Sequence, residues 1–304
     1  MRTSSLRNSR GNCLDNMLIK ENEPMSKHLT FRIGGAARFF VEVTNVEELK
    51  EAMAMAEEKK LPWFVLGGGS NTLCADEGYD GVVIQMSNRE VSVDGDRLVA
   101  GAGCISVVAS RSAEAASLSG IEWMVSLPGT IGGAVRGNAG CFGVEIKDVV
   151  ESVRVLCDGE VIELINSDCQ FAYRESIFKH NHDVIIDVTF KLVSGNKEEI
   201  KEKMTEVLGK RKSTQPTASG TAGCVFKNPL VDGKLMSCGK LIDDLGLKGT
   251  KIGGISVSDV HGNFLVNDGT ATADQVIQLI SLIKTRARNE LGVQLQEEIQ
   301  YLGF

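Results

Sequence analysis

Apolar residues recur at helical spacing from Val46 to Lys60, which predicts an amphipathic helix with one buried face. Pro62 ends this helix, and the apolar run Trp63–Leu66 behind it predicts a short buried strand. Small residues predict a second helix over Ser106–Ser119. Further strands are predicted where apolar residues alternate or cluster, at Val82–Gln85, Val91–Val93, Arg97–Ala100 and Asp183–Leu192.

The last third of the chain predicts a charged helix over Lys197–Arg211 and a long helix near the end. The long helix begins at a capping box, Thr272-x-x-Gln275, and ends at Gly292. A final strand is predicted over Val293–Leu302. Turn sequences predict hairpins at Asp94-Gly95, Asp158-Gly159 and His261-Gly262-Asn263.

The main domain boundary is predicted after Gly195, where a charged helix is followed by a stretch rich in Ser, Gly and Thr that ends near Ser219. The sequence thus predicts three parts: a flexible N-terminal extension at 1–27, a larger domain at 28–195 and a smaller domain at 196–304.

The composition is that of an ordinary globular protein, with 42% hydrophobic and 24% charged residues in a chain of 304. A net charge of −7 argues against nucleic acid as a partner. Residues 1–27 lack the apolar stretch of a secretory signal, and no run approaches the roughly 18 apolar residues of a membrane helix. The eight cysteines form no C-x-x-C pair, and no ligand cluster accompanies the histidines. We therefore expect a cytoplasmic protein that binds no membrane and no metal.

Two glycine-rich segments are candidates for cofactor binding. Successive glycines let backbone N–H groups converge on phosphate oxygens, although a plain tight turn or a helix contact would also explain them. The G-x-G-x-x-G fingerprint is absent, because Thr72 occupies the third glycine position. The candidate cofactor-binding residues are Gly67, Gly68, Gly69, Ser70, Asn71, Pro128, Gly129, Thr130, Gly132, Gly133, Asn138, Ala139 and Gly140.

Three other side chains are candidates for chemistry. Arg174 lies in an apolar segment, where it is either a fixed cation near developing negative charge or the partner of a carboxylate. Cys224 follows a glycine and is either a proton donor or a packed thiol. Glu298 is either a functional carboxylate or part of an exposed strand face. The residues alone support a phosphate-bearing cofactor and no particular reaction.

The combined motifs resemble the UDP-N-acetylenolpyruvoylglucosamine reductase family (MurB) over residues 28–303. Each motif is short, but eight occur in the family's order, and this order carries the resemblance. The motifs are Thr30–Gly35, Leu66–Asn71, Pro128–Ala134, Asn138–Gly140, Tyr173–Ser176, Gln215-Pro216, Phe226–Pro229 and Leu295–Ile299.

The resemblance implies an α+β fold, with an FAD-binding domain of the vanillyl-alcohol-oxidase (PCMH) type at 28–195 and a smaller α+β substrate-binding domain at 196–304. It implies an enzyme that uses NADPH to convert UDP-N-acetylglucosamine enolpyruvate to UDP-N-acetylmuramate in peptidoglycan precursor synthesis. The FAD is expected to be non-covalent, because relatives that attach it carry His after the glycine pair, where this chain has Ser70. A monomer or weak oligomer is expected.

The resemblance also assigns catalytic roles by position. Arg174 would polarise the enolpyruvyl carboxylate, and Glu298 would assist there. Cys224 would protonate carbon 2 after hydride reaches carbon 3. Three residues would lie beside the substrate: Tyr173, Lys227 and Asn228.

The chain departs from the family pattern at three places. The family's common proton donor is Ser, and Cys224 stands in its place; a thiol is more acidic than an alcohol and can still donate. Gln296 replaces the first Glu of the terminal motif. Phe178 leads almost directly into the next strand, without the tyrosine-bearing insertion of longer members, which places the chain in the short subclass.

Two other functions are compatible with the cofactor domain. One is an FAD oxidase or dehydrogenase acting on another alcohol or sugar, against which the Phe226–Pro229 motif argues. The other is a nucleotide-sugar-binding regulator without activity, against which Arg174 and Glu298 argue.

Overall fold

The computed structural model describes residues 17–216 and 220–304, which form two compact units. The first unit comprises residues up to Glu21, Phe39–Gly68 and Gly81–Gly209. The second comprises Asn22–Arg38, Gly69–Asp80 and Lys210–Phe304. The second unit therefore includes two segments from the first third of the chain. The sequence-based limits 28–195 and 196–304 stay a prediction of where the cofactor and substrate domains lie.

The predicted N-terminal extension lies partly outside the described residues, which begin at Met17. Within its remaining part, Ile19–Pro24 form strand β1. Structure therefore begins before residue 28.

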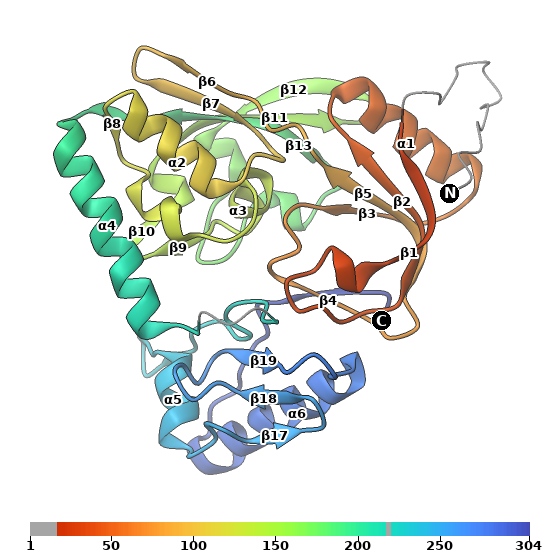
Figure 1. The fold of residues 1–304 in the computed structure, drawn as a ribbon, viewed down its shortest axis with the longest axis vertical. Helices are drawn as coiled ribbons and strands as arrows, with labels where there is room; N and C mark the ends of the chain where they lie inside the picture. Colours follow the sequence, from red (N-terminus) through yellow and green to blue (C-terminus); the bar gives the residue numbers. More distant parts are fainter. Residues whose placement is uncertain (1–16, 217–219) are drawn as a thin grey trace. The chain divides into compact units, whose positions relative to one another are not determined.

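A five-stranded antiparallel sheet with the order β12-β11-β13-β7-β6 forms the centre of the first unit (Figure 1). Its strands are β6 (Val91–Asp94), β7 (Arg97–Gly101), β11 (Val150–Cys157), β12 (Glu160–Ile165) and β13 (Val184–Lys191). The alternation of each strand turns residues such as Leu98, Val153 and Val188 into the core, where they are fully buried. Helices α2 (Ser106–Ala115) and α3 (Ile131–Arg136) pack against this core.

A four-stranded sheet has the order β1-β2-β5-β3, with β3 parallel to β5. Its remaining strands are β2 (Ala36–Val43), β3 (Trp63–Leu66) and β5 (Tyr79–Met86). Helix α1 (Val46–Glu58) begins at Asn45, whose side chain accepts a hydrogen bond from the Glu48 N–H at 2.9 Å. The apolar face of α1, including Leu49, joins the same core cluster as Val41 and Ile84.

Several short elements complete the first unit. The strands are β8 (Leu118–Ser119), β9 (Gly140–Cys141), β10 (Val144–Glu145) and β14 (Val193–Ser194). Helix α4 (Lys197–Thr214), whose residues from Lys210 on belong to the second unit, is charged along most of its length. Its Ile200 and Met204 are buried against Val125.

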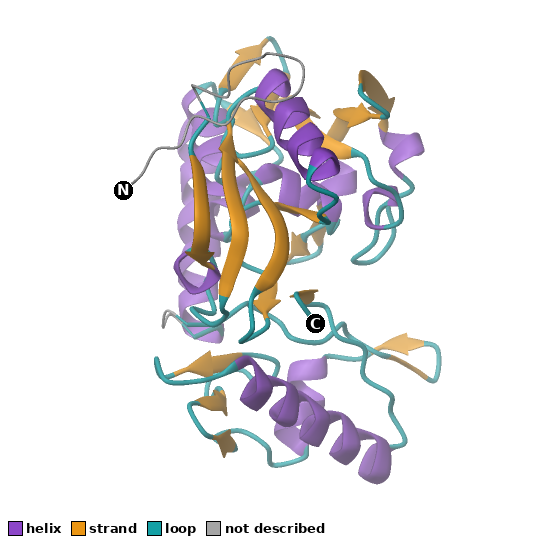
Figure 2. Cartoon of the chain, turned by 90° about the vertical axis from the view of Figure 1, so that its right-hand side faces the viewer, coloured by secondary structure: helices purple, strands orange, loops and turns teal. Residues whose placement is uncertain are grey.

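The second unit contains a three-stranded antiparallel sheet, β17-β18-β19, against which helix α6 packs (Figure 2). The sheet consists of β17 (Lys251–Ile252), β18 (Ile255–Val257) and β19 (Leu265–Asn267). The second unit also contains the strand pair β15 (Leu230–Val231) and β16 (Lys234–Leu235). Its helices are α5 (Cys238–Asp244) and α6 (Ala273–Leu291). In the same unit β20 (Gln300–Leu302) lies parallel to β4 (Thr72–Cys74).

Most predicted elements are confirmed, including the capping box of α6 and its left-handed C-cap at Gly292. Two predicted bounds were wrong by more than three residues. Helix α2 ends at Ala115 rather than Ser119, because Ser117 adopts a positive φ of 57° and Leu118-Ser119 pair with β14. The predicted strand Val293–Leu302 shrinks to β20 and one isolated bridge at Glu297, because this segment changes its pairing partner on the way.

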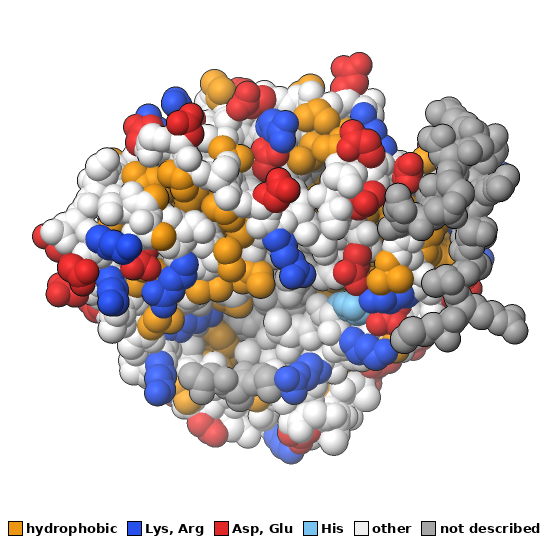
Figure 3. Space-filling view, turned by 45° about the horizontal axis from the view of Figure 1, so that its top comes forward, with side chains coloured by type: hydrophobic (Ala, Val, Ile, Leu, Met, Phe, Trp, Pro, Cys, Tyr) orange, Lys and Arg blue, Asp and Glu red, His pale blue; other side chains and the backbone are white. Residues whose placement is uncertain are grey.

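Acidic and basic side chains are interspersed over the face shown in Figure 3. Among the described residues, no helix combines the length and apolar character that crossing a membrane requires.

His261 is a half-buried titratable group of the second unit. Its ring stacks edge-on against Phe264 at 4.9 Å, and its Nδ1 accepts a hydrogen bond from the Asn263 N–H at 3.2 Å. Burial, with a smaller effect from Lys248, lowers the pKa of His261 below the ordinary 6.5. The folded protein therefore holds this ring neutral at a pH where the unfolded chain has begun to bind a proton.

We expect the free energy of unfolding to fall as the pH drops from about 6.5 through the lower folded pKa, because protonation favours the unfolded chain. Denaturant titrations at several pH values would measure the slope, which His261→Gln should reduce. An unchanged slope in that variant would contradict this assignment.

Candidate active site

The two glycine-rich segments predicted separately come together in the first unit. A Cβ on Gly67 would lie 2.4 Å from Thr130 Oγ1, and a Cβ on Gly68 would lie 2.7 Å from the Cα of Gly129. Both distances are shorter than real Cβ contacts, so Thr130 and Gly129 come this close only because Gly67 and Gly68 lack side chains. The structure thus places Gly67 and Gly68 against the Gly129-Thr130 segment that opens α3.

Thr130 carries an unused hydrogen-bonding group at this meeting point. Its side chain is 7% exposed, and its Oγ1 is buried without a hydrogen-bond partner. A buried hydroxyl without a partner costs roughly 1–3 kcal/mol, which a bound acceptor would offset. A glycine cradle with a spare hydroxyl fits a phosphate-bearing cofactor.

The remainder of the first glycine motif belongs to the second unit. Gly69 has a φ of 62°, and a Cβ there would lie 2.1 Å from the carbonyl oxygen of His28. Its own carbonyl accepts a hydrogen bond from the Thr30 N–H at 3.1 Å. Asn71 Nδ2 donates to the backbone oxygen of Glu298 at 3.1 Å. The side-chain amide of Asn71 therefore has a protein partner in addition to its predicted cofactor role.

Asn138 holds the segment around Arg174. It is fully buried, and its Nδ2 donates to the carbonyl of Ala172 at 2.8 Å and to Glu145 Oε2 at 3.1 Å. Its Oδ1 accepts from the Lys147 N–H at 3.0 Å. The predicted cofactor role of Asn138, Ala139 and Gly140 stays a prediction, because the side chain of Asn138 is engaged within the protein.

Arg174 occupies a turn position that favours glycine. Ala172 and Glu175 exchange two backbone hydrogen bonds of 3.0 Å, so Tyr173 and Arg174 are the central residues of a tight turn. Arg174 has a φ of 57°, which is uncommon for a residue with a side chain. Its guanidinium donates to the carbonyl of Gly140 at 3.0 Å and lies 5.2 Å from the centre of the Tyr173 ring. A residue with a side chain that is held at this φ is a candidate for a functional role.

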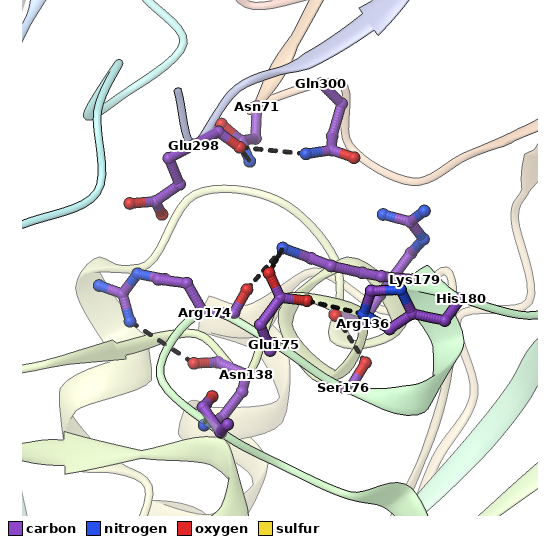
Figure 4. Close-up of polar contacts among 11 residues, drawn as sticks. Asn71, Arg136, Asn138, Arg174, Glu175, Ser176, Lys179, His180, Glu298 and Gln300 are labelled. Atoms are coloured by element: carbon purple, nitrogen blue, oxygen red, sulfur yellow. Dashed lines mark hydrogen bonds and ion pairs between the residues drawn. The ribbon is translucent and has the colours of Figure 1, made fainter. Parts of the chain in front are cut away.

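Further charged side chains surround this turn (Figure 4). Lys179 Nζ donates to the Arg174 carbonyl at 2.5 Å, and Glu175 lies 4.0 Å from Lys179 Nζ and 3.2 Å from His180 Nε2. Burial lowers the pKa of the Arg136 guanidinium, while Glu175 opposes this shift. Arginine stays protonated regardless. Lys179 and Arg136 thus place positive charge near the Glu175 carboxylate.

Cys224 lies in a segment of the second unit that is hydrogen-bonded to the segment around Asn263. Cys224 forms a bridge with Phe264, and the Val225 N–H donates to the carbonyl of Asn263 at 2.9 Å. Asn263 is buried, and its side chain exchanges hydrogen bonds of 2.9 and 2.8 Å with the backbone of Phe226. Cys224 itself is half-buried.

Glu298 lies on the other side of this segment. The Glu298 N–H donates to the carbonyl of Val225 at 2.7 Å, and the Lys227 N–H donates to the carbonyl of Gln296 at 2.8 Å. The backbone of Glu298 is therefore hydrogen-bonded to the segment that carries Cys224 and Lys227. The structure thus brings Cys224, Lys227 and Glu298 onto two hydrogen-bonded segments of the second unit.

Asn228, predicted beside the substrate, accepts a hydrogen bond from the Cys238 N–H at 2.9 Å through its Oδ1. Burial, with a smaller contribution from Cys224, raises the pKa of the Cys238 thiol to about 12. Cys238 is therefore a buried, neutral thiol near Cys224.

Sequence reasoning missed Asn263 and Gln300. Asn263 was assigned only to a turn, yet it organises the Cys224 segment, and Gln300 donates to the Glu298 carbonyl at 3.1 Å. Asn263 acts on Phe226, 37 positions away, and the backbone N–H of Gln300 pairs with the distant Asn71, so no local motif indicated either residue.

The glycine cradle and the sheet around it define the class of an FAD-binding protein. The family model described as "FAD binding domain" matches residues 37–165, and that of the C-terminal domain of UDP-N-acetylenolpyruvoylglucosamine reductase matches 215–302. The predicted FAD cofactor is thereby confirmed.

The relatives identify the family. The chain is 37% identical over 295 residues to the UDP-N-acetylenolpyruvoylglucosamine reductase of Clostridioides difficile, covering 96% of each chain. It is 39% identical over 284 residues to that of Caldanaerobacter subterraneus, covering 93% of each. The crystal structure of the reductase from Thermus caldophilus matches with a TM-score of 0.81 at 35% identity, covering 94% of this chain and 99% of that one. The chain belongs to the UDP-N-acetylenolpyruvoylglucosamine reductase family, and the predicted α+β fold is confirmed.

Proposed function

We propose that the chain reduces the enolpyruvyl ether of UDP-N-acetylglucosamine enolpyruvate to UDP-N-acetylmuramate with NADPH as the reductant. The observation that carries this proposal is the nearly full-length similarity to UDP-N-acetylenolpyruvoylglucosamine reductases. The match to the C. difficile enzyme covers 96% of this chain and 96% of that enzyme. This step supplies a precursor of peptidoglycan. We further propose that it takes place in the cytoplasm, in a monomer or weak oligomer.

We propose that FAD is held non-covalently by the glycine cradle at Gly67, Gly68 and Gly129, with Thr130 Oγ1 as an additional hydrogen-bonding group. FAD bound there supplies hydride transfer from NADPH to carbon 3 of the enolpyruvyl group. Ser70, where covalent relatives carry His, offers no nitrogen for attachment to the flavin.

Arg174 is proposed to bind the enolpyruvyl carboxylate. Negative charge develops on this group when hydride adds to carbon 3, and a fixed cation stabilises it without reorganisation. The Gly140 carbonyl orients the guanidinium, as its 3.0 Å hydrogen bond indicates. Glu298 is proposed to assist at the same end of the substrate, with Tyr173, Lys227 and Asn228 beside it.

Cys224 is proposed to donate its Sγ proton to carbon 2. The proton completes the reduction that the hydride begins, and the thiolate left behind recovers a proton from water. Its half-buried position gives the thiol access to a ligand.

An FAD oxidase acting on another alcohol or sugar is the second candidate function. The FAD-binding model over residues 37–165 is compatible with it, because that model names a cofactor and no substrate. The match of the C-terminal domain to residues 215–302 favours the reductase.

We expect purified protein to be yellow and to release its flavin into the supernatant after acid precipitation. Gly68→Ala should weaken FAD retention, because the added Cβ would lie 2.7 Å from the backbone of Gly129. Gly209→Ala is the matched control, since a Cβ there meets nothing within 4 Å. Flavin absorbance per mole of protein measures both variants. Protein that stays colourless with added FAD, or flavin that precipitates with the protein, would contradict the cofactor assignment.

A further inference from the structure

The backbone of Glu298 is fixed from both sides within the second unit. Its N–H donates to the Val225 carbonyl at 2.7 Å. Its carbonyl accepts from two side-chain amides, Asn71 Nδ2 at 3.1 Å and Gln300 Nε2 at 3.1 Å. The two amide donors together use both lone pairs of this backbone oxygen, so its position is restrained from two directions.

The same two amide-bearing residues are tied to each other. The Gln300 N–H donates to the Asn71 carbonyl at 2.8 Å, and this bond continues into the parallel pairing of β20 with β4. Asn71 thus reaches Glu298 from the turn position directly before β4, 227 positions away in the sequence. Figure 4 shows both amides directed at the Glu298 carbonyl, while the Glu298 carboxylate points away from them.

The neighbouring residue adds a further restraint. Glu297 Oε1 pairs with Lys284 Nζ of α6 at 2.7 Å, and Glu297 forms a bridge with Phe226. Consecutive residues of an extended chain direct their side chains to opposite faces. Fixing Glu297 on one face therefore helps to fix the direction of Glu298 on the other.

We infer that Asn71, with Gln300, is a positioning residue that sets the place of the Glu298 carboxylate for the reduction of the substrate. This inference rests on the role of Glu298 given under the proposed function. It assigns the side-chain amide of Asn71, which the glycine motif predicted for cofactor binding, to the backbone carbonyl of Glu298. A displacement of about 1 Å at a catalytic group can lower turnover by about a hundredfold.

The test compares Asn71→Ala, the isosteric Asn71→Asp, which removes the donor and keeps the shape, and Gln300→Leu, which removes the second donor. Each Asn71 variant should retain FAD and near-normal substrate KM while kcat falls by about tenfold to a hundredfold. Gln300→Leu should have a smaller effect in the same direction. Amide hydrogen exchange should become faster across residues 296–300 in all three, independently of activity.

A double-mutant cycle with Glu298→Gln separates positioning from general loss of structure. If Asn71 acts through Glu298, the Asn71→Ala and Glu298→Gln effects on kcat should be strongly non-additive. Asn267→Ala is the matched control: it removes a buried amide–carbonyl hydrogen bond of 2.9 Å to Phe31 in the same unit and should combine additively with Glu298→Gln.

Each outcome decides one claim. Additive effects of Asn71→Ala and Glu298→Gln, or loss of FAD from the Asn71 variants with unchanged exchange at residues 296–300, would overturn the positioning role and leave the proposed function intact. Unchanged kcat in Glu298→Gln alone would instead overturn the catalytic role of Glu298 on which the inference rests.

Discussion

Arg174→Gly is expected to lower kcat by about a hundredfold or more while leaving the folded protein at least as stable as the wild type. The two effects separate because Arg174 has a φ of 57°. This conformation costs a residue with a side chain about 1 kcal/mol and costs glycine almost nothing. Removing the side chain thus relieves backbone strain and removes the cation in one substitution.

The two halves of the reaction locate the defect. Reduction of the bound flavin by NADPH should continue in Arg174→Gly, whereas reoxidation by the enolpyruvyl substrate should be slow. Arg174→Lys keeps the charge but not the planar guanidinium with its several donors, so its turnover should lie between those of the wild type and Arg174→Gly. Stopped-flow absorbance of the flavin measures both steps.

Asp158→Gly is the matched control for strain. Asp158 has a φ of 47° in the exposed turn between β11 and β12, so the variant gains the same backbone freedom away from the candidate site. It should keep wild-type kcat. Wild-type turnover in Arg174→Gly as well would show that Arg174 only shapes its turn.

Cys224→Ala is expected to reduce its flavin at the normal rate and to reoxidise it slowly with substrate. A positioned proton donor contributes about 10²–10⁴-fold, and alanine has no proton to give. Cys224→Ser should retain substantial activity, because a hydroxyl can occupy the same place. Rapid-mixing measurement of flavin reoxidation gives both rates.

Alkylation provides the accompanying control. A thiol reagent should inactivate the wild type and spare Cys224→Ser, since burial keeps Cys238 and Cys74 neutral, with pKa values of about 12. An unchanged reoxidation rate in Cys224→Ala would assign the proton to another donor.

The sequence predicted correctly those helix ends that are determined by hydrogen bonds between residues close together in the chain. The capping box at Thr272 and the C-cap at Gly292 bound α6 as predicted, because both are hydrogen-bonding motifs within a few residues. The strand at Ala36–Val43 was not predicted, since its burial depends on β1 and β5 as neighbours. The final strand was overextended because its partner changes from the Phe226 segment to β4, which alternation along one chain cannot indicate.

In the candidate site, too, the sequence indicated which residues matter, whereas their contacts are visible only in the structure. The glycine clusters were recognisable from composition, but only the structure shows that Gly68 touches Gly129 and that Thr130 has an unused hydroxyl. Arg174 was identified by its motif, whereas its positive φ is visible only in the structure. Asn71 was predicted to bind cofactor from its place in the glycine motif, and its contact with Glu298 joins residues that no sequence window spans.

The most direct test of the proposed reaction is an anaerobic single turnover of the purified protein. NADPH is added first, in an amount equal to the flavin, and UDP-N-acetylglucosamine enolpyruvate second, while the flavin spectrum is recorded and the product is analysed by mass spectrometry. The account predicts that the flavin bleaches with NADPH, regains its colour with the substrate, and yields one UDP-N-acetylmuramate per flavin. Flavin that is reduced by NADPH but stays reduced in the presence of the substrate would contradict it.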